Sequence, residues 1–338
     1  MKRAGYLTDE IADLENLRLA FWKAKKGKSG KEEVRVFGKN LDKNLISMSG
    51  EILGGAVSVG DYSYFRVYDP KERLICAAAF RERVLHHAIM NVCGPLFEKF
   101  QIHDSYATRP GKGQYAALER VRGWVVKGLW FCKLDVRKFF DSIDHGILYR
   151  QLCGKFKDAH LLGIFRRIID SYGTAPGRGV PIGNLTSQYF ANFYLAHLDH
   201  FVKEKLRVKK YVRYMDDMVA LYSDKEDLIK FSKGVENYCE SELKLKLKPV
   251  CLNSAETGIP FLGYVIFPDG VRLNKGSKRR FLLKHGLYAR KLETGEWSQK
   301  EYARRAEPLF AFTRFANSLG FRRSVMEKTE AGQGAPTA

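Results

Sequence analysis

Hydrophobic residues recur at helical spacing over much of the chain. In residues 7–24, apolar side chains return every three or four positions, and Thr8 can cap the first turn. The apolar positions are Ile11, Leu14, Leu17 and Phe21. The same spacing predicts further helices over 40–54, 81–99, 114–127, 144–171, 184–206 and 225–242. From about residue 275 onward the chain is predicted to be helical and basic.

Other segments have the composition of strands, rich in aromatic and β-branched residues. Residues 62–68 and 72–78 predict a hairpin around Asp69-Pro70-Lys71. Further strands are predicted at 129–136, 210–214, 218–222 and 243–248, and a hairpin at 260–273. Because these strands come from distant parts of the chain and must pair into one antiparallel sheet, we expect an α+β fold.

Charge points to an anionic partner. The chain has 338 residues and a net charge of +20, with 45% hydrophobic residues. A phosphate backbone is the usual partner of such an excess, and an acidic membrane surface is the alternative. No apolar run reaches about 18 residues, so we expect no membrane span. No signal peptide opens the chain, and we expect a cytoplasmic protein. The six cysteines form no CxxC pair, which favours reduced core cysteines over a zinc site.

The strongest chemical signal is Tyr214-Met215-Asp216-Asp217, a tight turn between two predicted strands. Adjacent carboxylates on an apolar hairpin repel each other and lose hydration. A divalent cation removes that cost, and hard oxygen ligands suit Mg²⁺. An ordinary Asx turn between strands is the alternative.

Asp135 adds a third carboxylate, at the end of the apolar strand 129–136. Two-metal phosphoryl transfer needs carboxylates from separate strands, with the ions about 4 Å apart. Asp135 and Asp216 would supply that pair across one sheet. One ion would activate a primer 3′-hydroxyl and the other would neutralise the leaving pyrophosphate. Mn²⁺ would substitute for Mg²⁺. A strand cap at Asp135 is the alternative.

Several motifs in order resemble those of reverse transcriptases. The YMDD turn follows an upstream strand that ends in Asp-Val-Arg-Lys-Phe-Phe-Asp-Ser-Ile-Asp, residues 135–144. Phe80–Val84 and Ser105–Gly111 are similar to finger motifs, and Phe261–Tyr264 is similar to the primer-grip hairpin. The resemblance implies a right-hand polymerase fold with fingers, an antiparallel-sheet palm and a helical thumb.

The resemblance also implies domain boundaries. They are an N-terminal helical extension at 1–60, fingers at 61–130, a palm at 131–265 with a finger insertion at about 146–180, a thumb at 266–325 and a disordered tail at 326–338.

Residues 182–188 point to one lineage. Group II intron and retroviral enzymes carry Gln-Gly-x-x-x-Ser-Pro here, whereas this chain has Ile-Gly-Asn-Leu-Thr-Ser-Gln. That pattern resembles the reverse transcriptases of diversity-generating retroelements, which are encoded by bacteria or phages. Those enzymes copy a template RNA into cDNA with errors at adenines, and the cDNA replaces a variable gene region. They work with a small basic oligomeric accessory protein, and no long maturase or endonuclease domain is expected after the thumb.

The resemblance assigns further roles residue by residue. Asp135, Asp216 and Asp217 would hold metal, with the carbonyl of Val136 as an added ligand. Phe140 would be the steric gate against a ribose 2′-hydroxyl, with an ordinary core phenylalanine as the alternative. The remaining residues assigned to the incoming dNTP are Lys71, Arg73, Ile182, Gly183 and Gln188. Solvated positions on a hairpin are the alternative for Lys71 and Arg73.

The general acid and the nucleic-acid contacts are assigned in the same way. Lys248, after the alternating Leu-Lys segment 243–247, is the candidate acid for pyrophosphate, and a charged strand face is the alternative. The residues assigned to nucleic-acid binding are Arg109, Lys278, Arg279, Arg280 and Lys284. The expected partners are template RNA, the cDNA or primer strand, and dNTPs. A retron or phage-defence reverse transcriptase and a catalytically silent RNA-binding scaffold are the competing functions.

Overall fold

The computed structural model describes residues 3–68 and 72–330. The chain divides into two compact units, each built from segments far apart in the sequence. The first unit takes its residues from Met1–Arg109, Val136–Arg207 and Lys233–Lys248, and the second from Pro110–Asp135, Val208–Ser232 and Pro249–Ala338. Each unit is described by itself.

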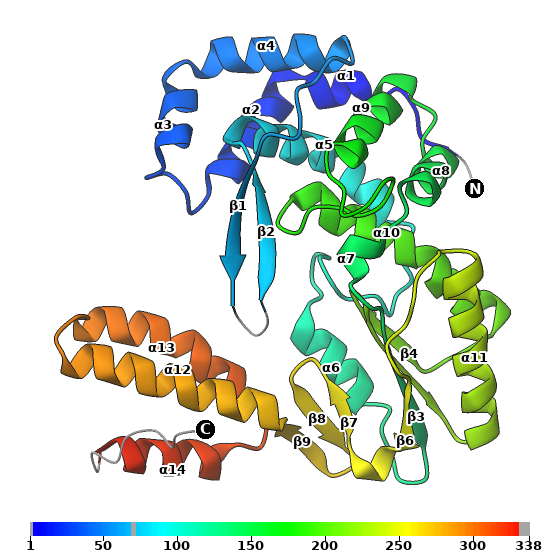
Figure 1. The fold of residues 1–338 in the computed structure, drawn as a ribbon, viewed down its shortest axis with the longest axis vertical. Coiled ribbons are helices and arrows are strands. Elements are labelled where there is room, and N and C mark those ends of the chain that lie inside the picture. The colour runs from blue at the N-terminus through cyan, green and yellow to red at the C-terminus, as the bar shows by residue number, and fades with distance from the viewer. Residues whose placement is uncertain (1–2, 69–71, 331–338) are drawn as a thin grey trace. The chain divides into compact units, whose positions relative to one another are not determined.

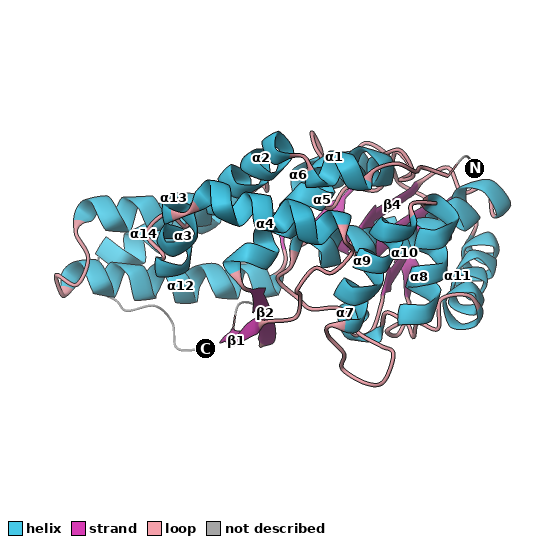
Figure 2. Cartoon of the chain, turned by 90° about the horizontal axis from the view of Figure 1, so that it is seen from above, coloured by secondary structure: helices cyan, strands magenta, loops and turns pink. Residues whose placement is uncertain are grey.

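The first unit is mainly helical (Figure 2). Its N-terminal helices are α1 (Thr8–Ala12), α2 (Leu14–Lys25), α3 (Glu32–Lys39), α4 (Leu41–Leu53) and α5 (Phe80–Glu98). The single helix predicted at 7–24 is wrong. Asp13 adopts ψ 134° between α1 and α2, and its side chain accepts hydrogen bonds from the backbone N–H groups of Glu15 and Asn16. This N-cap starts α2 and ends α1. Thr8 is no cap and lies buried instead.

A β-hairpin follows these helices. β1 (Tyr62–Val67) and β2 (Arg73–Ala78) pair antiparallel, as predicted, and Figure 1 shows the two arrows side by side. The predicted turn at 69–71 lies outside the described residues.

The helices α7 (Phe139–Ser142), α8 (His145–Lys155), α9 (Ala159–Asp170) and α10 (Leu185–His200), with a π-helical turn at Phe201–Lys205, complete most of this unit. The single helix predicted at 144–171 is wrong, because Phe156 is extended and Asp158 caps a new helix through the N–H of Leu161. The core centres on Phe97. Its ring contacts those of Phe156, Phe165, Phe190 and Phe193.

The second unit contains a four-stranded antiparallel sheet in the order β4-β5-β3-β6. Its strands are β3 (Trp130–Asp135), β4 (Tyr211–Tyr214), β5 (Asp217–Tyr222) and β6 (Cys251–Ser254). Helix α6 (Gln114–Arg122) belongs to this unit, and α11 (Lys225–Ser241) contributes residues to both units. The predicted strand at 243–248 is wrong: Leu243 and Leu245 are buried, but Lys244 takes φ 51° and breaks the extended backbone.

A three-stranded sheet and three helices complete the second unit. The strands are β7 (Ile259–Phe261), β8 (Tyr264–Phe267) and β9 (Gly270–Leu273), and the helices are α12 (Lys275–Glu293), α13 (Gln299–Arg314) and α14 (Leu319–Glu330). The Tyr264 hydroxyl donates to the carbonyl of Phe312, which ties β8 to α13. Gly263 has φ 89°, and a Cβ there would lie 2.9 Å from the Ser277 hydroxyl, so only glycine fits.

Three expectations need correction. Within the described residues the strands form three sheets of two, four and three strands, so the single sheet is wrong although the α+β class holds. Helix α14 extends to Glu330, into the predicted tail. Cys251 is exposed and Cys153 half-buried, so only four cysteines are core residues. Among the described helices, none combines the length and apolar character needed to cross a bilayer.

Candidate active site

Asp135 and Asp217 face each other across two neighbouring strands. Antiparallel pairing of β3 with β5 places Asp135 directly opposite Asp217. Asp217 also pairs with Tyr214 at the end of the β4–β5 hairpin. Asp216 lies in the turn beside it, after Met215, which takes φ 54°. The second unit therefore brings the three predicted carboxylates together at one end of its sheet.

Burial makes this end of the sheet unfavourable for negative charge. Burial and the neighbouring carboxylates of Asp135 and Asp216 raise the pKa of Asp217 to about 7, although Lys133 acts in the opposite direction. The Lys133 ammonium lies 3.5 Å from Oδ1 of Asp217. Lys133 thus acts as an internal counter-ion for the carboxylates.

Sequence reasoning did not single out Lys133 or Arg213. Alternation along β3 places Lys133 on the same face as Asp135, two residues away. This spacing is visible in the sequence and could have identified Lys133. Arg213 is fully buried and donates a hydrogen bond of 3.0 Å to the carbonyl of Met215. It therefore holds the turn that carries Asp216. An arginine inside an otherwise apolar strand was the feature of the sequence that could have identified it.

The donor chemistry fits Mg²⁺. Carboxylate oxygens are the hard ligands that Mg²⁺ prefers, and a cation removes the cost of ionising Asp217 in a buried place. Within the described ranges, no group of three or more His, Cys, Asp or Glu side chains is placed to hold a metal ion by itself. Mg²⁺ commonly takes one or two carboxylates from a protein and completes its shell with water and substrate phosphates. Val136 is buried beside Asp135 and forms an isolated bridge with Leu247.

Residues assigned to the nucleotide lie in the first unit. The carbonyl of Ile182 accepts a hydrogen bond of 2.8 Å from the N–H of Cys76 on β2. Gly183 has φ 120°, and a Cβ there would lie 2.9 Å from Ile75 and 3.0 Å from the carbonyl of Cys76. Only glycine allows this approach, so Gly183 has a structural reason to be present. The loop before α10 is thereby docked onto the hairpin that carries Arg73.

Phe140 lies beside the loop that leads to Ile182, and Gln188 lies on the helix that follows this loop. The N–H of Val180 donates to the carbonyl of Phe140, so the segment that leads to Ile182 runs beside α7. The Phe140 ring is half-buried, whereas its neighbour Phe139 is buried. On α10, the side chain of Gln188 accepts a hydrogen bond of 3.4 Å from Thr108. Arg73 is exposed, and Lys71 lies outside the described residues.

Arg109 has a structural role in place of the predicted nucleic-acid contact. Its side chain is 8% exposed. The guanidinium forms an ion pair with Glu98 and also donates to the carbonyls of Ile102 and Ser105, each at 2.6 Å. Because its donors serve these internal partners, Arg109 is not available to a phosphate.

The other predicted cations differ in how they are held. On α12, Lys278 and Arg279 are exposed, whereas Arg280 is half-buried and donates to the Ser277 hydroxyl. Lys284 is half-buried on the same helix. Lys248 is half-buried and follows Leu247, the residue that bridges to Val136.

Comparison with known proteins places the chain in a family. It is 26% identical over 40% of its length to nuclear intron maturase 1, mitochondrial, of Arabidopsis thaliana, and 24% identical over 41% to protein YkfC of Escherichia coli. The matches span only 20% and 41% of those two proteins. Apo telomerase from Candida tropicalis shares 12% identity, with a TM-score of 0.47 over 64% of this chain and 49% of that one. Residues 69–266, more than half of the chain, match the family model, so the chain belongs to the reverse transcriptase (RNA-dependent DNA polymerase) family.

Proposed function

We propose that this protein is an RNA-directed DNA polymerase that extends a primer on a template RNA by two-metal nucleotidyl transfer. The observation that carries the proposal is the register that sets Asp135 opposite Asp217, next to Asp216. These carboxylates lie partly buried, and the Lys133 ammonium lies 3.5 Å from that of Asp217. Within a chain of this family, that arrangement supports a site for divalent cations at which a phosphoryl group reacts.

Asp135, Asp216 and Asp217 would hold two Mg²⁺ ions, with the carbonyl of Val136 as an added ligand. When bound, the ions would supply Lewis-acid activation of the primer 3′-hydroxyl and neutralise charge on the leaving pyrophosphate. Lys133 balances the carboxylates in the absence of metal, and Arg213 holds the turn. Lys248 is proposed as the acid that protonates pyrophosphate.

The first unit would bind the incoming dNTP. Arg73 on the β1–β2 hairpin would contact the triphosphate, as would Lys71. Ile182, Gly183 and Gln188 would line the base pair, and Phe140 would exclude a ribose. The docking of the Ile182 loop onto β2 supports their joint action, because it fixes this loop relative to Arg73.

We further propose the diversity-generating type, with errors at template adenines and a small basic accessory protein as partner. Its support is the Ile182–Gln188 segment, in which apolar Ile182 stands where accurate relatives carry a glutamine. The fingers, palm and thumb boundaries belong to the same proposal. The exposed cations of α12 support a thumb that grips a duplex through its backbone.

Primer extension on an adenine-containing RNA template, with Mg²⁺ and four dNTPs, tests both levels of the proposal. The wild type should extend the primer, and Asp216→Asn should lose extension while RNA binding persists, because the amide loses the charge that offsets Mg²⁺. Extension by the variant within about ten-fold of wild type contradicts the metal assignment. RNA binding without extension by the wild type would identify a silent scaffold.

Sequencing the cDNA tests the diversity-generating type. Errors concentrated opposite adenine support it. Uniform errors at all four template bases leave the polymerase in place and favour a retron or phage-defence enzyme.

A further inference from the structure

The turn of the first unit that carries Phe140 is short and begins at a strained residue. Helix α7 is one turn long, Phe139–Ser142, and it follows Lys138, which takes φ 47°. A left-handed conformation costs energy for a residue other than glycine, so it persists only where other contacts stabilise it. The position of Phe140 therefore depends on what holds this turn.

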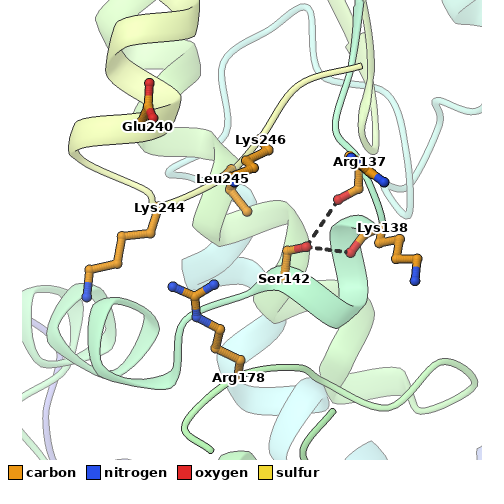
Figure 3. Close-up of a pocket in the computed structure, with 8 residues that line it drawn as sticks. All are labelled: Arg137, Lys138, Ser142, Arg178, Glu240, Lys244, Leu245 and Lys246. Atoms are coloured by element: carbon orange, nitrogen blue, oxygen red, sulfur yellow. Dashed lines mark hydrogen bonds between the residues drawn. The ribbon is translucent and has the colours of Figure 1, made fainter. Parts of the chain in front are cut away.

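The Ser142 hydroxyl holds the turn from inside. It donates to the carbonyl of Lys138 at 2.9 Å and to that of Arg137 at 3.1 Å (Figure 3). The bonds run from the last residue of α7 back to the two residues that precede the helix. A serine hydroxyl has one proton, so the two carbonyls share it. This hydroxyl thus closes the turn on both sides of Phe140.

A cavity lies beside the same turn. Its volume is about 450 Å³, and Arg137, Lys138 and Ser142 contribute to its lining (Figure 3). Arg178 and Lys246 are among the other residues around it. Residues that line a cavity lack the close contacts that fix side chains in a packed core. On the cavity side, the turn is therefore held by hydrogen bonds more than by packing.

The segment that leads to Ile182 holds the turn from another direction. The N–H of Val180 donates to the carbonyl of Phe140 at 2.9 Å, and the Thr174 hydroxyl donates to the carbonyl of Asp141 at 2.8 Å. The bond from Val180 is a backbone bond, which a side-chain substitution leaves in place. The bonds from the Ser142 hydroxyl can be removed by mutation, so their effect on Phe140 can be measured.

We propose that Ser142 is a positioning residue for the choice between deoxyribose and ribose, and that it acts through Phe140. The inference rests on the proposed function, in which the Phe140 ring excludes a ribonucleotide. Such a gate works by a clash with one oxygen atom, so a small displacement of the ring changes the discrimination. Without the hydroxyl, the strained backbone at Lys138 relaxes toward the cavity and Phe140 moves with it. Ser142 itself does not contact the nucleotide.

Single-nucleotide incorporation opposite a template uridine tests the proposal, with dATP and ATP compared in Mg²⁺. Ser142→Ala should lower the ratio of kcat/KM for dATP over ATP by about five-fold or more, chiefly because ATP is used better. A purely structural loss would lower the use of both nucleotides and leave the ratio unchanged, and that result overturns the proposal.

Matched variants separate the hydroxyl from other effects. Ser142→Thr keeps the hydroxyl, and its methyl group has room in the cavity, so the ratio should stay near that of the wild type. Ser142→Cys, with a weaker donor, serves if the alanine variant does not fold, and should also lower the ratio. Ser47→Ala is the control, because it removes a hydroxyl that donates to Glu51 elsewhere in the same unit. A ratio lowered equally in Ser142→Thr contradicts the role of the hydroxyl.

A double-mutant cycle with Phe140→Ala tests whether Ser142 acts through the ring. In the Phe140→Ala background, Ser142→Ala should leave the ratio almost unchanged, because no ring remains to be positioned. Additive effects of the two substitutions overturn the proposal. If Phe140→Ala lowers the ratio and Ser142→Ala does not, this inference fails and the gate stands. If neither lowers it, the gate fails too, and a wild type that extends no primer refutes the proposed polymerase itself.

Discussion

Asp135 at the end of β3 lies directly opposite Asp217 at the start of β5. The two residues are far apart in sequence, and they meet because their strands pair antiparallel in one register. A shift of one residue would send one of the carboxylates to the other face of the sheet. The chemistry proposed for this protein therefore depends on strand register as much as on residue type.

Lys133→Met should destabilise the metal-free protein by about 1.5–3 kcal/mol, because the carboxylates lose a charged partner. In EDTA the melting temperature should fall, and added Mg²⁺ should raise it by more than in the wild type, since no lysine then competes with the cation. Lys127→Met, an exposed position of the same unit, is the control. An equal Mg²⁺ effect in wild type and variant would show that Lys133 is not the counter-ion.

Phe140→Ala should admit ribonucleotides. Removing the half-buried ring opens space where a 2′-hydroxyl would sit, and discrimination between dNTP and rNTP should fall by about ten-fold or more. Single-nucleotide incorporation measures the ratio. Phe139→Leu is the control: Phe139 is buried, so its change should lower stability and leave discrimination unaltered. A ratio unchanged by Phe140→Ala rules out the gate.

Ile182→Gln should reduce errors opposite template adenine. One polar contact to a correct pair is worth about 1 kcal/mol, or roughly five-fold in selectivity. An A–T pair has fewer hydrogen bonds than G–C, so it depends more on the pocket. The hydrogen bond from Cys76 reaches the Ile182 backbone, so it survives the substitution. If Ile182 only fills space, the variant loses activity with an unchanged error spectrum, which sequencing of the cDNA would reveal; Ile182→Asn is the companion variant.

Neutralising Lys278, Arg279, Arg280 and Lys284 in succession should weaken RNA binding progressively. Arg279→Gln should reduce the slope of log affinity against log salt by about one, because the side chain is exposed and can reach a phosphate. Arg280 should matter less, since it also donates to Ser277. Fluorescence anisotropy across a salt series measures the slope, with Lys43→Gln as the control. A flat salt dependence in the wild type contradicts the thumb assignment.

Asp158→Asn should destabilise the first unit by about 1.5–3 kcal/mol at neutral pH. Burial alone would raise the pKa of Asp158, but hydrogen bonds from Thr8, Leu7 and Leu161 hold it below the usual value. The carboxylate's contribution is therefore full above the unfolded pKa and is lost as pH falls through the lower folded pKa.

Urea unfolding should thus show the difference between wild type and Asp158→Asn shrinking from pH 7 toward pH 3. Asp9→Asn, at an exposed position, should show no such pattern. A difference that stays constant with pH would mean that the charge of Asp158 contributes nothing.

Local patterns determined much of this protein. Periodicity placed α4, α5, α10 and the β1–β2 and β4–β5 hairpins close to their observed limits, because each follows from the spacing of apolar residues within one segment. The YMDD turn and Asp135 were recognisable for the same reason, because a charged residue at the end of an apolar strand can be identified from the sequence alone.

Only the tertiary structure decided what depends on distant partners. Asp158, which caps a new helix inside the predicted helix 144–171, also accepts hydrogen bonds from the N–H groups of Leu7 and Thr8 near the start of the chain. Arg109 has a guanidinium that could bind phosphate, yet its N–H groups donate to Glu98 and to two backbone carbonyls. The pairing of Lys133 with Asp217, and the gathering of Arg178, Lys246 and Arg137 around one pocket, required strands and loops from separate segments to meet. A sequence specifies which residues are charged, but their partners are set by packing, because ion pairs and hydrogen bonds act over only a few ångströms.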